Sequence, residues 1–391
     1  MRYFKFLLGR YAEFAILAII PFWLAYEIEP SEYSKLLFAT ILFQLSSFVT
    51  SISGTTYLKL KVDGKNFGEG TAILMIVSVV AIVSFSIYQG NYDVIVYLSC
   101  MAALGNVFRG GYQNYLRGND RIDSLSKFNA IYPSFFLLAY IFLREEYDVS
   151  VVIYLISQCI GLLASSLYAF YIVNRFGFLK LSMIFKGASQ VRMRYRTLVN
   201  ITLINMFGYI MLQSDKVYLS YIDIDESIKG KYLFLDNIGN ILYFSVASIG
   251  FAISPYLMKQ IKDTSGQLFF RHLSYWSGLV LISSITFFFF VEFVVFSIFH
   301  VYEISNELLF SVTLVKSMIL VQFIPQTYLL TVGKERLIMI SQLASCSGFI
   351  FMLFNYNGSY IQYVFTLSLS SMLCVVFMIT GIYKNKVPKN A

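Results

Sequence analysis

The chain contains the stretch Glu29-Pro-Ser-Glu-Tyr-Ser-Lys-Leu-Leu-Phe38, and a related stretch, Asp225-Glu-Ser-Ile-Lys-Gly-Lys-Tyr-Leu-Phe234, follows at an offset of 196 residues. The identical aligned pairs are Ser31/Ser227, Lys35/Lys231, Leu37/Leu233 and Phe38/Phe234. A second match joins Gly118-Asn-Asp-Arg-Ile122 to Gly333-Lys-Glu-Arg-Leu337. Chance can produce two matches this short, but both relate equivalent positions of two successive halves, as a duplicated chain requires. We therefore predict an internal repeat.

The apolar segments around these stretches are separated by gaps whose charge alternates. Twenty-four of the 30 Lys and Arg residues fall in every second gap or, like Arg10, Arg109 and Lys127, in the adjoining part of a span, and the gaps between them are acidic or uncharged. Since Lys and Arg are retained on the cytoplasmic side during insertion, this pattern predicts twelve spans with both termini in the cytoplasm. The approximate spans are 8–26, 33–58, 71–89, 94–116, 127–143, 149–173, 197–222, 231–257, 274–298, 305–331, 337–354 and 360–383.

The composition also indicates a membrane protein. Apolar residues make up 58% of the chain, charged residues 13%, and the mean hydropathy is +0.67. Soluble domains carry about 25% charged residues, whereas a helix of about 20 apolar residues spans a bilayer. The net charge of +8 follows from the alternating gaps, so we predict no nucleic-acid partner.

The spans and the repeat together predict the domain organisation. We expect an all-α polytopic membrane protein with two pseudo-symmetric six-helix lobes, because polar backbone must be satisfied internally within a bilayer. Residues 1–175 form the N-terminal lobe, 176–196 a cytoplasmic basic linker and 197–391 the C-terminal lobe. The linker is compatible with an interfacial segment or with a solvated connection.

Polar residues form stripes along the second, seventh and eighth spans. Gln44 and Ser47 belong to the stripe of the second span, and the repeat aligns Gln44 with Asn240. Gln213 and Lys216 lie on one side of the seventh span. Since lipid cannot satisfy such a stripe, we predict that these spans line an aqueous cavity between the lobes. The alternative is hydrogen bonding between helices in a closed bundle.

Lys316 is the strongest functional candidate among the charged residues within the spans. It lies about eleven residues into the tenth span, with no carboxylate one helical turn away. A charge at such depth is a functional candidate, unless its long stem carries the ammonium to the interface. On this basis we expect Lys316→Ala to abolish function and to leave the protein inserted and abundant, because it removes an unpaired charge.

Other charges have competing explanations. Asp215 and Lys216 are adjacent, so their side chains diverge by about 100° around a helix, and they form either a cavity site or a local ion pair. Arg10 and Glu13 are spaced to pair on the first span or to anchor its end. Arg109 is close enough to the cytoplasm to extend its guanidinium to the interface.

Motifs for catalysis or metal binding are not evident. The two histidines, His272 and His300, fall at opposite ends of one span, and the four cysteines lie within spans without paired spacing. We therefore predict no catalytic residue, no metal site and no disulfide framework.

Several stretches resemble one transporter superfamily. They are Gln213-Ser-Asp-Lys-Val-Tyr-Leu219, Gly230-Lys-Tyr-Leu-Phe234, Pro255 and the turns Tyr115-Leu-Arg-Gly-Asn-Asp-Arg121 and Leu330-Thr-Val-Gly-Lys-Glu-Arg336. With twelve spans in two halves, the chain resembles the multidrug/oligosaccharidyl-lipid/polysaccharide (MOP) exporter superfamily, and within it the Wzx-type flippases of polysaccharide biosynthesis. The resemblance covers nearly the whole chain through loose motifs, and the connections are shorter than is usual in that family.

The resemblance implies a MATE-like fold and a flippase of the bacterial inner membrane that translocates undecaprenyl-diphosphate-linked O-antigen or capsule repeat units. Glycan polymerase and chain-length machinery are its expected partners besides membrane lipid. A cation-coupled multidrug exporter of the same fold, or a membrane glycan polymerase, is the alternative. No cofactor is expected, and coupling to H⁺, to Na⁺ or to the membrane potential is left open.

The expected site residues fall into two groups. By matching helices, the resemblance implies cavity cations at Arg10, Arg109, Lys216 and Lys316, of which only Lys216 rests on a motif match. Polar stripes add Gln44, Gln213 and Asn240 to the substrate-binding cavity. The candidates for ion coupling are Glu13, Asp215 and Asp236.

Overall fold

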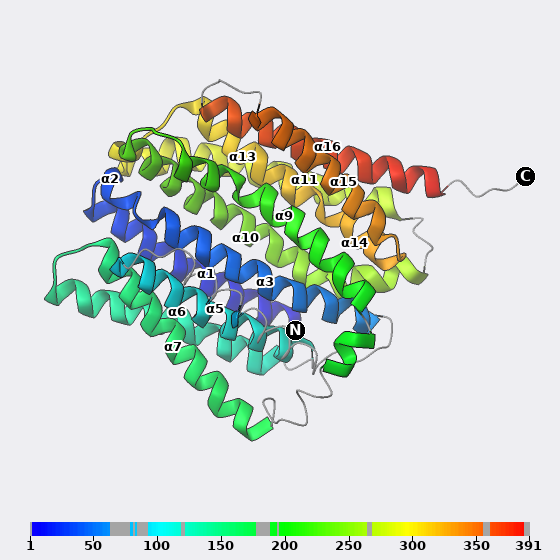
Figure 1. Ribbon diagram of the computed structural model, residues 1–391, viewed down its shortest axis with the longest axis horizontal. Helices are drawn as coiled ribbons and strands as arrows, with labels where there is room; N and C mark the ends of the chain where they lie inside the picture. The colour runs from blue at the N-terminus through cyan, green and yellow to red at the C-terminus, as the bar shows by residue number, and fades with distance from the viewer. Residues whose placement is uncertain are drawn as a thin grey trace, which may run out of the picture. The chain divides into compact units, whose positions relative to one another are not determined.

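The computed structural model describes residues 2–62, 79–80, 83, 93–118, 122–176, 188–193, 195–263, 268–354 and 360–386 (Figure 1). Within these ranges every regular element is a helix and no strand occurs. The prediction of an all-α membrane protein is confirmed. Long apolar segments form helices here because the helix satisfies its own backbone groups.

The helices follow the predicted spans closely. They are α1 (Arg2–Glu27), α2 (Pro30–Tyr33), α3 (Leu36–Val62), α5 (Val94–Gly118), α6 (Ile122–Glu146), α7 (Val151–Phe176), α9 (Tyr195–Tyr221), α10 (Glu226–Asp263), α11 (Phe269–Phe290), the π-helix η1 (Val291–Val295), α12 (Phe296–Ile298), the 3₁₀-helix η2 (His300–Tyr302), α13 (Asn306–Val321), α14 (Phe323–Thr331), α15 (Glu335–Phe354) and α16 (Tyr360–Lys386).

The predicted third span, 71–89, lies outside the described residues apart from 79, 80 and 83. The count of twelve spans and the cytoplasmic position of both termini therefore stay predictions. Eight helical segments of the described chain are long and apolar enough to cross a membrane. Large apolar side chains on them, such as Leu138 and Phe293, are well exposed, as lipid-facing residues are.

The tenth predicted span is divided into α13 and α14. Pro325 has no N–H to donate to the carbonyl of Val321, where α13 ends. Pro21 and Pro133, in contrast, lie inside the uninterrupted helices α1 and α6. The ninth span is also irregular, because α11 passes into the π-helix η1 at Val291.

The chain forms two compact units. One comprises Met1–Ile201 with Lys216–Phe234, and the other comprises Thr202–Asp215 with Leu235–Ala391. In the first unit α3 packs on α5, α1 on α6, and both α5 and α6 on α7. In the second, α13, α14 and α15 pack on α16, and α11 packs on α13 and α14. The predicted lobe boundaries, at 175 and 197, stay predictions.

The two repeated stretches touch each other inside the first unit. The hydroxyl of Ser34 donates to Oε2 of Glu226 at 2.7 Å, and the backbone carbonyl of Pro30 occupies the place that a Cβ on Gly230 would take. The repeat aligns Pro30 with Glu226 and Ser34 with Gly230. When each residue is replaced by its aligned counterpart, the contact of Ser34 with Glu226 becomes the contact of Gly230 with Pro30. Such reciprocity is the signature of a two-fold relation, and it supports the predicted offset of 196 residues.

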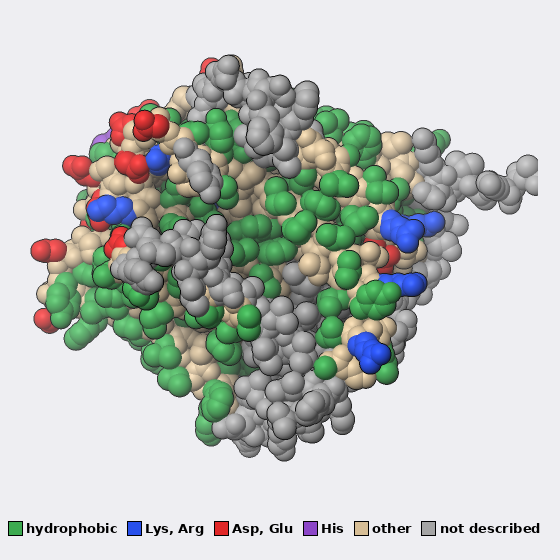
Figure 2. Space-filling model, viewed as in Figure 1, with side chains coloured by type: hydrophobic (Ala, Val, Ile, Leu, Met, Phe, Trp, Pro, Cys, Tyr) green, Lys and Arg blue, Asp and Glu red, His purple; other side chains and the backbone are tan. Residues whose placement is uncertain are grey.

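The surface reflects the same division between apolar and charged regions. Figure 2 shows apolar side chains over much of one face, with Asp and Glu gathered near one end of the helices and Lys and Arg also found at the opposite end. Charges at the helix ends and apolar residues between them are what a bilayer requires of a polytopic protein.

Candidate functional site

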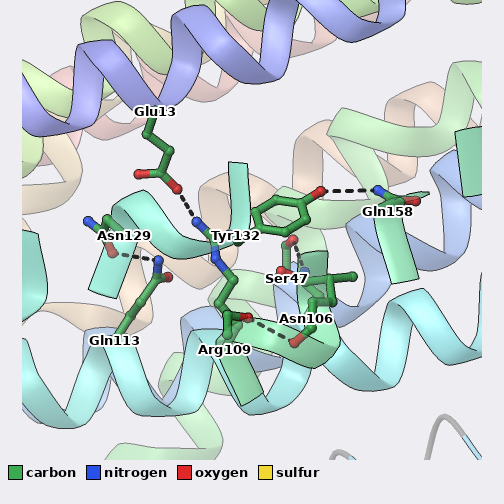
Figure 3. A network of polar contacts seen from close by, with 10 residues as sticks. Glu13, Ser47, Asn106, Arg109, Gln113, Asn129, Tyr132 and Gln158 are labelled. Atoms are coloured by element: carbon green, nitrogen blue, oxygen red, sulfur yellow. Dashed lines mark hydrogen bonds and ion pairs between the residues drawn. The ribbon is translucent and has the colours of Figure 1, made fainter. Parts of the chain in front are cut away.

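A polar cluster in the first unit is centred on Arg109 of α5. Its guanidinium forms an ion pair with Glu13 of α1, and the two residues are 7% and 2% exposed (Figure 3). The guanidinium carbon also lies 4.6 Å from the ring centroid of Tyr132, on α6, in a cation–π contact. Nε2 of Gln158 donates to the Tyr132 hydroxyl at 3.4 Å. Nε of Arg109 is buried and has no hydrogen-bond acceptor among the described residues.

The same face of α5 carries two further amides. Nδ2 of Asn106 donates to the hydroxyls of Ser46 and Ser47 on α3, both at 2.8 Å. Nε2 of Gln113 donates to Asn129 at 2.9 Å. The positions 106, 109 and 113 share one helical face, so α5 directs a polar stripe into the unit.

The expectation that Arg109 could extend to the interface is wrong, because its side chain is buried and bound to Glu13. The pairing of Arg10 with Glu13 stays a prediction, since the side chain of Arg10 lies outside the described part of α1.

A second cluster lies in the second unit, between α10 and α13. Nζ of Lys316 is 2.6 Å from Oδ1 of Asp236 and donates to Oδ1 of Asn240 at 2.9 Å. Nδ2 of Asn240 donates to Oδ2 of Asp236 at 3.1 Å. Asp236 is fully buried and Lys316 is 3% exposed. The three side chains thus form a closed ring of polar contacts within the bundle.

The expectation that Lys316 carries an unpaired charge is wrong. Its carboxylate partner is on another helix, where helical spacing within the tenth span cannot reveal it. Removal of Lys316 therefore leaves the carboxylate of Asp236 buried, and Lys316→Ala is expected to destabilise the protein instead of sparing it.

The remaining candidates of the seventh span lie within four consecutive residues of α9. Gln213, Asp215 and Lys216 are at most 4% exposed, so burial extends to both members of the adjacent charged pair. The amide oxygen of Gln213 has no hydrogen-bond donor among the residues that the structure describes.

The polar stripes of the second and eighth spans make contacts between helices at two points. Ser47 accepts a hydrogen bond from Asn106, and Asn240 binds Lys316. At these two positions the contacts are hydrogen bonds between helices, which is the alternative to an aqueous cavity. Gln44 is half-buried on α3, and its place in a cavity stays a prediction.

Four residues of the first cluster were not predicted: Asn106, Gln113, Tyr132 and Gln158. A signal for them exists in the sequence, because Asn106 and Gln158 are strongly polar amides inside apolar runs. Such residues in a span normally face protein. The position of Tyr132 over the guanidinium depends on packing between α5 and α6 and has no sequence signal.

The sequence matches no protein-family model and no curated protein. The structure is similar to that of the lipid II flippase MurJ in an inward closed conformation, with a TM-score of 0.69 and 10% identity, covering 97% of this chain and 87% of MurJ. It is also similar to a MOP superfamily transporter from Pyrococcus furiosus, with a TM-score of 0.67 and 12% identity over 100% of this chain and 96% of the transporter.

The eukaryotic MATE transporter AtDTX14 gives a TM-score of 0.66 at 11% identity, over 97% of this chain and 94% of that one. The chain has the fold of MATE and MOP-superfamily transporters. The predicted MATE-like fold is thereby confirmed. At 10–12% identity these likenesses describe the fold, and the Wzx branch stays a prediction.

Proposed function

We propose that this chain is a flippase of the bacterial inner membrane that works by alternating access. Its substrate is an undecaprenyl-diphosphate-linked oligosaccharide, the repeat unit of an O-antigen or capsule. The observation that carries the proposal is the buried guanidinium of Arg109, whose Nε has no acceptor in the described part of a MOP-transporter fold.

A buried donor without an acceptor costs about 1–3 kcal/mol, so an anionic ligand that accepts from Nε of Arg109 would gain that free energy. Glu13 accepts a hydrogen bond from Nη2 of the guanidinium, and Arg offers five donors in a planar fork. A diphosphate suits such a donor because charge-assisted hydrogen bonds replace the water that the phosphate loses.

Two further positions on α9 fit the same substrate. Lys216 adds a second buried cation, and the amide oxygen of Gln213 can accept from a sugar hydroxyl. We propose that Arg10 and Gln44 complete the site and that the lipid tail stays in the bilayer. Lys316 and Asn240, also predicted for this cavity, bind Asp236, so a diphosphate must displace a carboxylate to reach Lys316.

The fold supports the proposal through one of its structural neighbours, which is a flippase of lipid II by name. We propose that the glycan polymerase and chain-length machinery of the same pathway receive the flipped unit. The energy source is H⁺, Na⁺ or the membrane potential, which acts on charge moved across the bilayer at about 2.3 kcal/mol per 100 mV.

The proposal is tested with purified protein in liposomes that contain a fluorescent undecaprenyl-diphosphate oligosaccharide. We expect the labelled lipid to become accessible to a membrane-impermeant quencher faster than in protein-free liposomes and in liposomes with an unrelated polytopic protein. In cells, deletion of the gene is expected to remove surface glycan and to trap the lipid-linked unit in the inner leaflet. Normal surface glycan in a deletion strain without another flippase would contradict the proposal.

A multidrug exporter of the same fold is the second candidate. Aromatic residues make up 18% of the chain, and this favours it, because amphipathic cations bind to the faces of aromatic rings. Glu13 and Asp236, however, are neutralised by cations of the chain itself. Increased resistance to cationic dyes on expression, with unchanged glycan display, would select this candidate.

A further inference from the structure

The carboxylate of Asp236 lies within Glu226–Gly250 of α10, a stretch long and apolar enough to span a membrane, and is fully buried. An ionised carboxylate in that place must have a cation beside it, since its desolvation is otherwise too costly. The cation can come from solution or from the chain. In this structure the chain supplies it through Lys316.

Two oxygens define the position that the ammonium occupies. Oδ1 of Asp236 is 2.6 Å and Oδ1 of Asn240 is 2.9 Å from Nζ. Carboxylate and amide oxygens are also the ligands of hard metal cations. Asn240 orients both groups, because its amide nitrogen holds the second carboxylate oxygen at 3.1 Å.

The stem of Lys316 reaches this position past Gly239. A Cβ built on Gly239 would lie 3.5 Å from Cε of Lys316 and 3.6 Å from Cγ1 of Val312. The lysine stem therefore lies against the surface of α10. The side chain brings a monovalent positive charge from α13 to the carboxylate oxygen of Asp236 and the amide oxygen of Asn240. Its place is fixed by packing along its length as well as by its charge.

From this geometry we propose that Asp236 and Asn240 form a monovalent cation site, and that the Lys316 ammonium fills it permanently in place of an ion from solution. The carboxylate of Asp236 then needs no Na⁺ beside it. Lys316 acts as a tethered counter-ion and not as a ligand of the transported diphosphate. Only the transport arm of the test rests on the proposed flippase function.

The site is tested by thermal unfolding of purified protein in neutral detergent, at constant ionic strength and pH, in choline, sodium, potassium or ammonium chloride. For Lys316→Ala we expect a lower Tm than wild type in choline chloride, and a saturable recovery in at least one of the small cations. Wild type is expected to have the same Tm in all four salts. The double variant Lys316→Ala/Asp236→Asn is expected to have a higher Tm than Lys316→Ala in choline chloride. Its Tm is expected not to depend on the cation, because the buried charge is gone.

The matched control is Lys229→Ala. Lys229 forms a pair with Glu226 at 2.7 Å, but the Glu226 side chain is 58% exposed and water can solvate it. We expect no cation-specific change of Tm in this variant. A Lys316→Ala protein whose Tm is as indifferent to the salts as the control, or a double variant that is no more stable than Lys316→Ala, would overturn the site.

Should Lys316→Ala fail to accumulate in membranes, its recovery by the added Asp236→Asn change supports the proposal, and equal loss of the double variant overturns it. The transport arm compares the ratio of the flipping rates in sodium and in choline buffers for wild type and for Lys316→Ala, and we expect sodium to increase the rate of the variant more than that of wild type. An equal ratio in the two proteins contradicts the tethered counter-ion. Lack of flipping in every buffer refutes the flippase function and leaves the unfolding result to decide the site.

Discussion

Lys316 on α13 and Asp236 on α10 form an ion pair, with Nζ and Oδ1 2.6 Å apart and both side chains shielded from solvent. The pair joins two helices of one unit at a depth where neither charge is tolerated alone. It therefore links α10 to α13, and the removal of either residue leaves the charge of its partner buried.

Removal of one residue of the pair is expected to destabilise the protein more than removal of both. Asp236→Ala leaves the lysine cation buried and should destabilise the protein by about 3–5 kcal/mol, whereas Asp236→Leu/Lys316→Met should cost much less. Denaturant unfolding of the two variants in detergent measures the difference. Equal costs for the single and double changes would mean that the residues do not depend on each other.

Arg109→Gln is expected to lower both stability and flipping. It leaves the Glu13 carboxylate buried without its guanidinium, at a cost of about 3–5 kcal/mol, and it removes the proposed phosphate ligand. The control is Lys35→Gln. Lys35 pairs with Glu32, and the two side chains are 52% and 34% exposed, so the expected loss is about 1 kcal/mol or less. Similar losses in the two variants, measured by unfolding, would contradict the buried role of Arg109.

A methyl group at position 230 is expected to disturb the contact between the repeated stretches. The Cβ of Gly230→Ala would overlap the backbone carbonyl of Pro30, which cannot rotate away as a side chain can. A reduced membrane level and Tm are expected. Gly278→Ala is the matched control, because no atom of the described residues, outside the backbone of its own helix, lies within 4 Å of its added Cβ, and its greater helix propensity should leave the Tm unchanged or raise it. A wild-type Tm for Gly230→Ala would show that the two stretches are not in close contact.

Asn106→Ala is expected to loosen α3 from α5. The change removes the donor to Ser46 and Ser47 and should cost about 1–3 kcal/mol for two buried hydrogen bonds. Ser297→Ala serves as the control, since its exposed hydroxyl donates to the carbonyl of Val294, one turn away on the same helical segment. Unfolding free energies compare the two, and a difference within error would sink the proposed link.

Lys216→Ala is expected to abolish surface glycan at matched protein levels, and Lys216→Arg to retain part of it, because both basic residues can contact phosphate. Lys259→Ala, at an exposed position of α10, should display wild-type glycan. Immunoblots for protein level and glycan staining provide the measurement. Wild-type glycan in Lys216→Ala would remove Lys216 from the substrate site.

The sequence could predict the helices because each span carries its own signal. Runs such as Val151–Phe176 need only sufficient apolar length between charged ends, and the chain satisfies that requirement locally. The offset between the repeats was also readable, and the contact of Ser34 with Glu226 agrees with it. These features depend on residues close together in the chain or on direct alignment.

The pairing of charges could not be predicted in the same way. Arg109 and Glu13 are separated by 96 positions, and Lys316 and Asn240 by 76. Helical spacing reveals partners one turn away on the same helix, whereas these partners face one another across helices. Depth within a span marked these charges as functional candidates, but it did not reveal their partners, because packing decides which helix faces each charge.

The reciprocal contact of the repeated stretches has a consequence for how the two halves can diverge. In a dimer of identical chains the same contact would occur twice, once on each side of the two-fold axis. Any substitution would then change both copies of the contact at once. In a single fused chain the two copies change independently. Here one contact is a hydrogen bond to a carboxylate, Ser34 to Glu226, and its counterpart is a close approach of Gly230 to the backbone of Pro30. The two equivalent contacts therefore differ chemically, since one depends on a polar side chain and the other on the absence of a side chain.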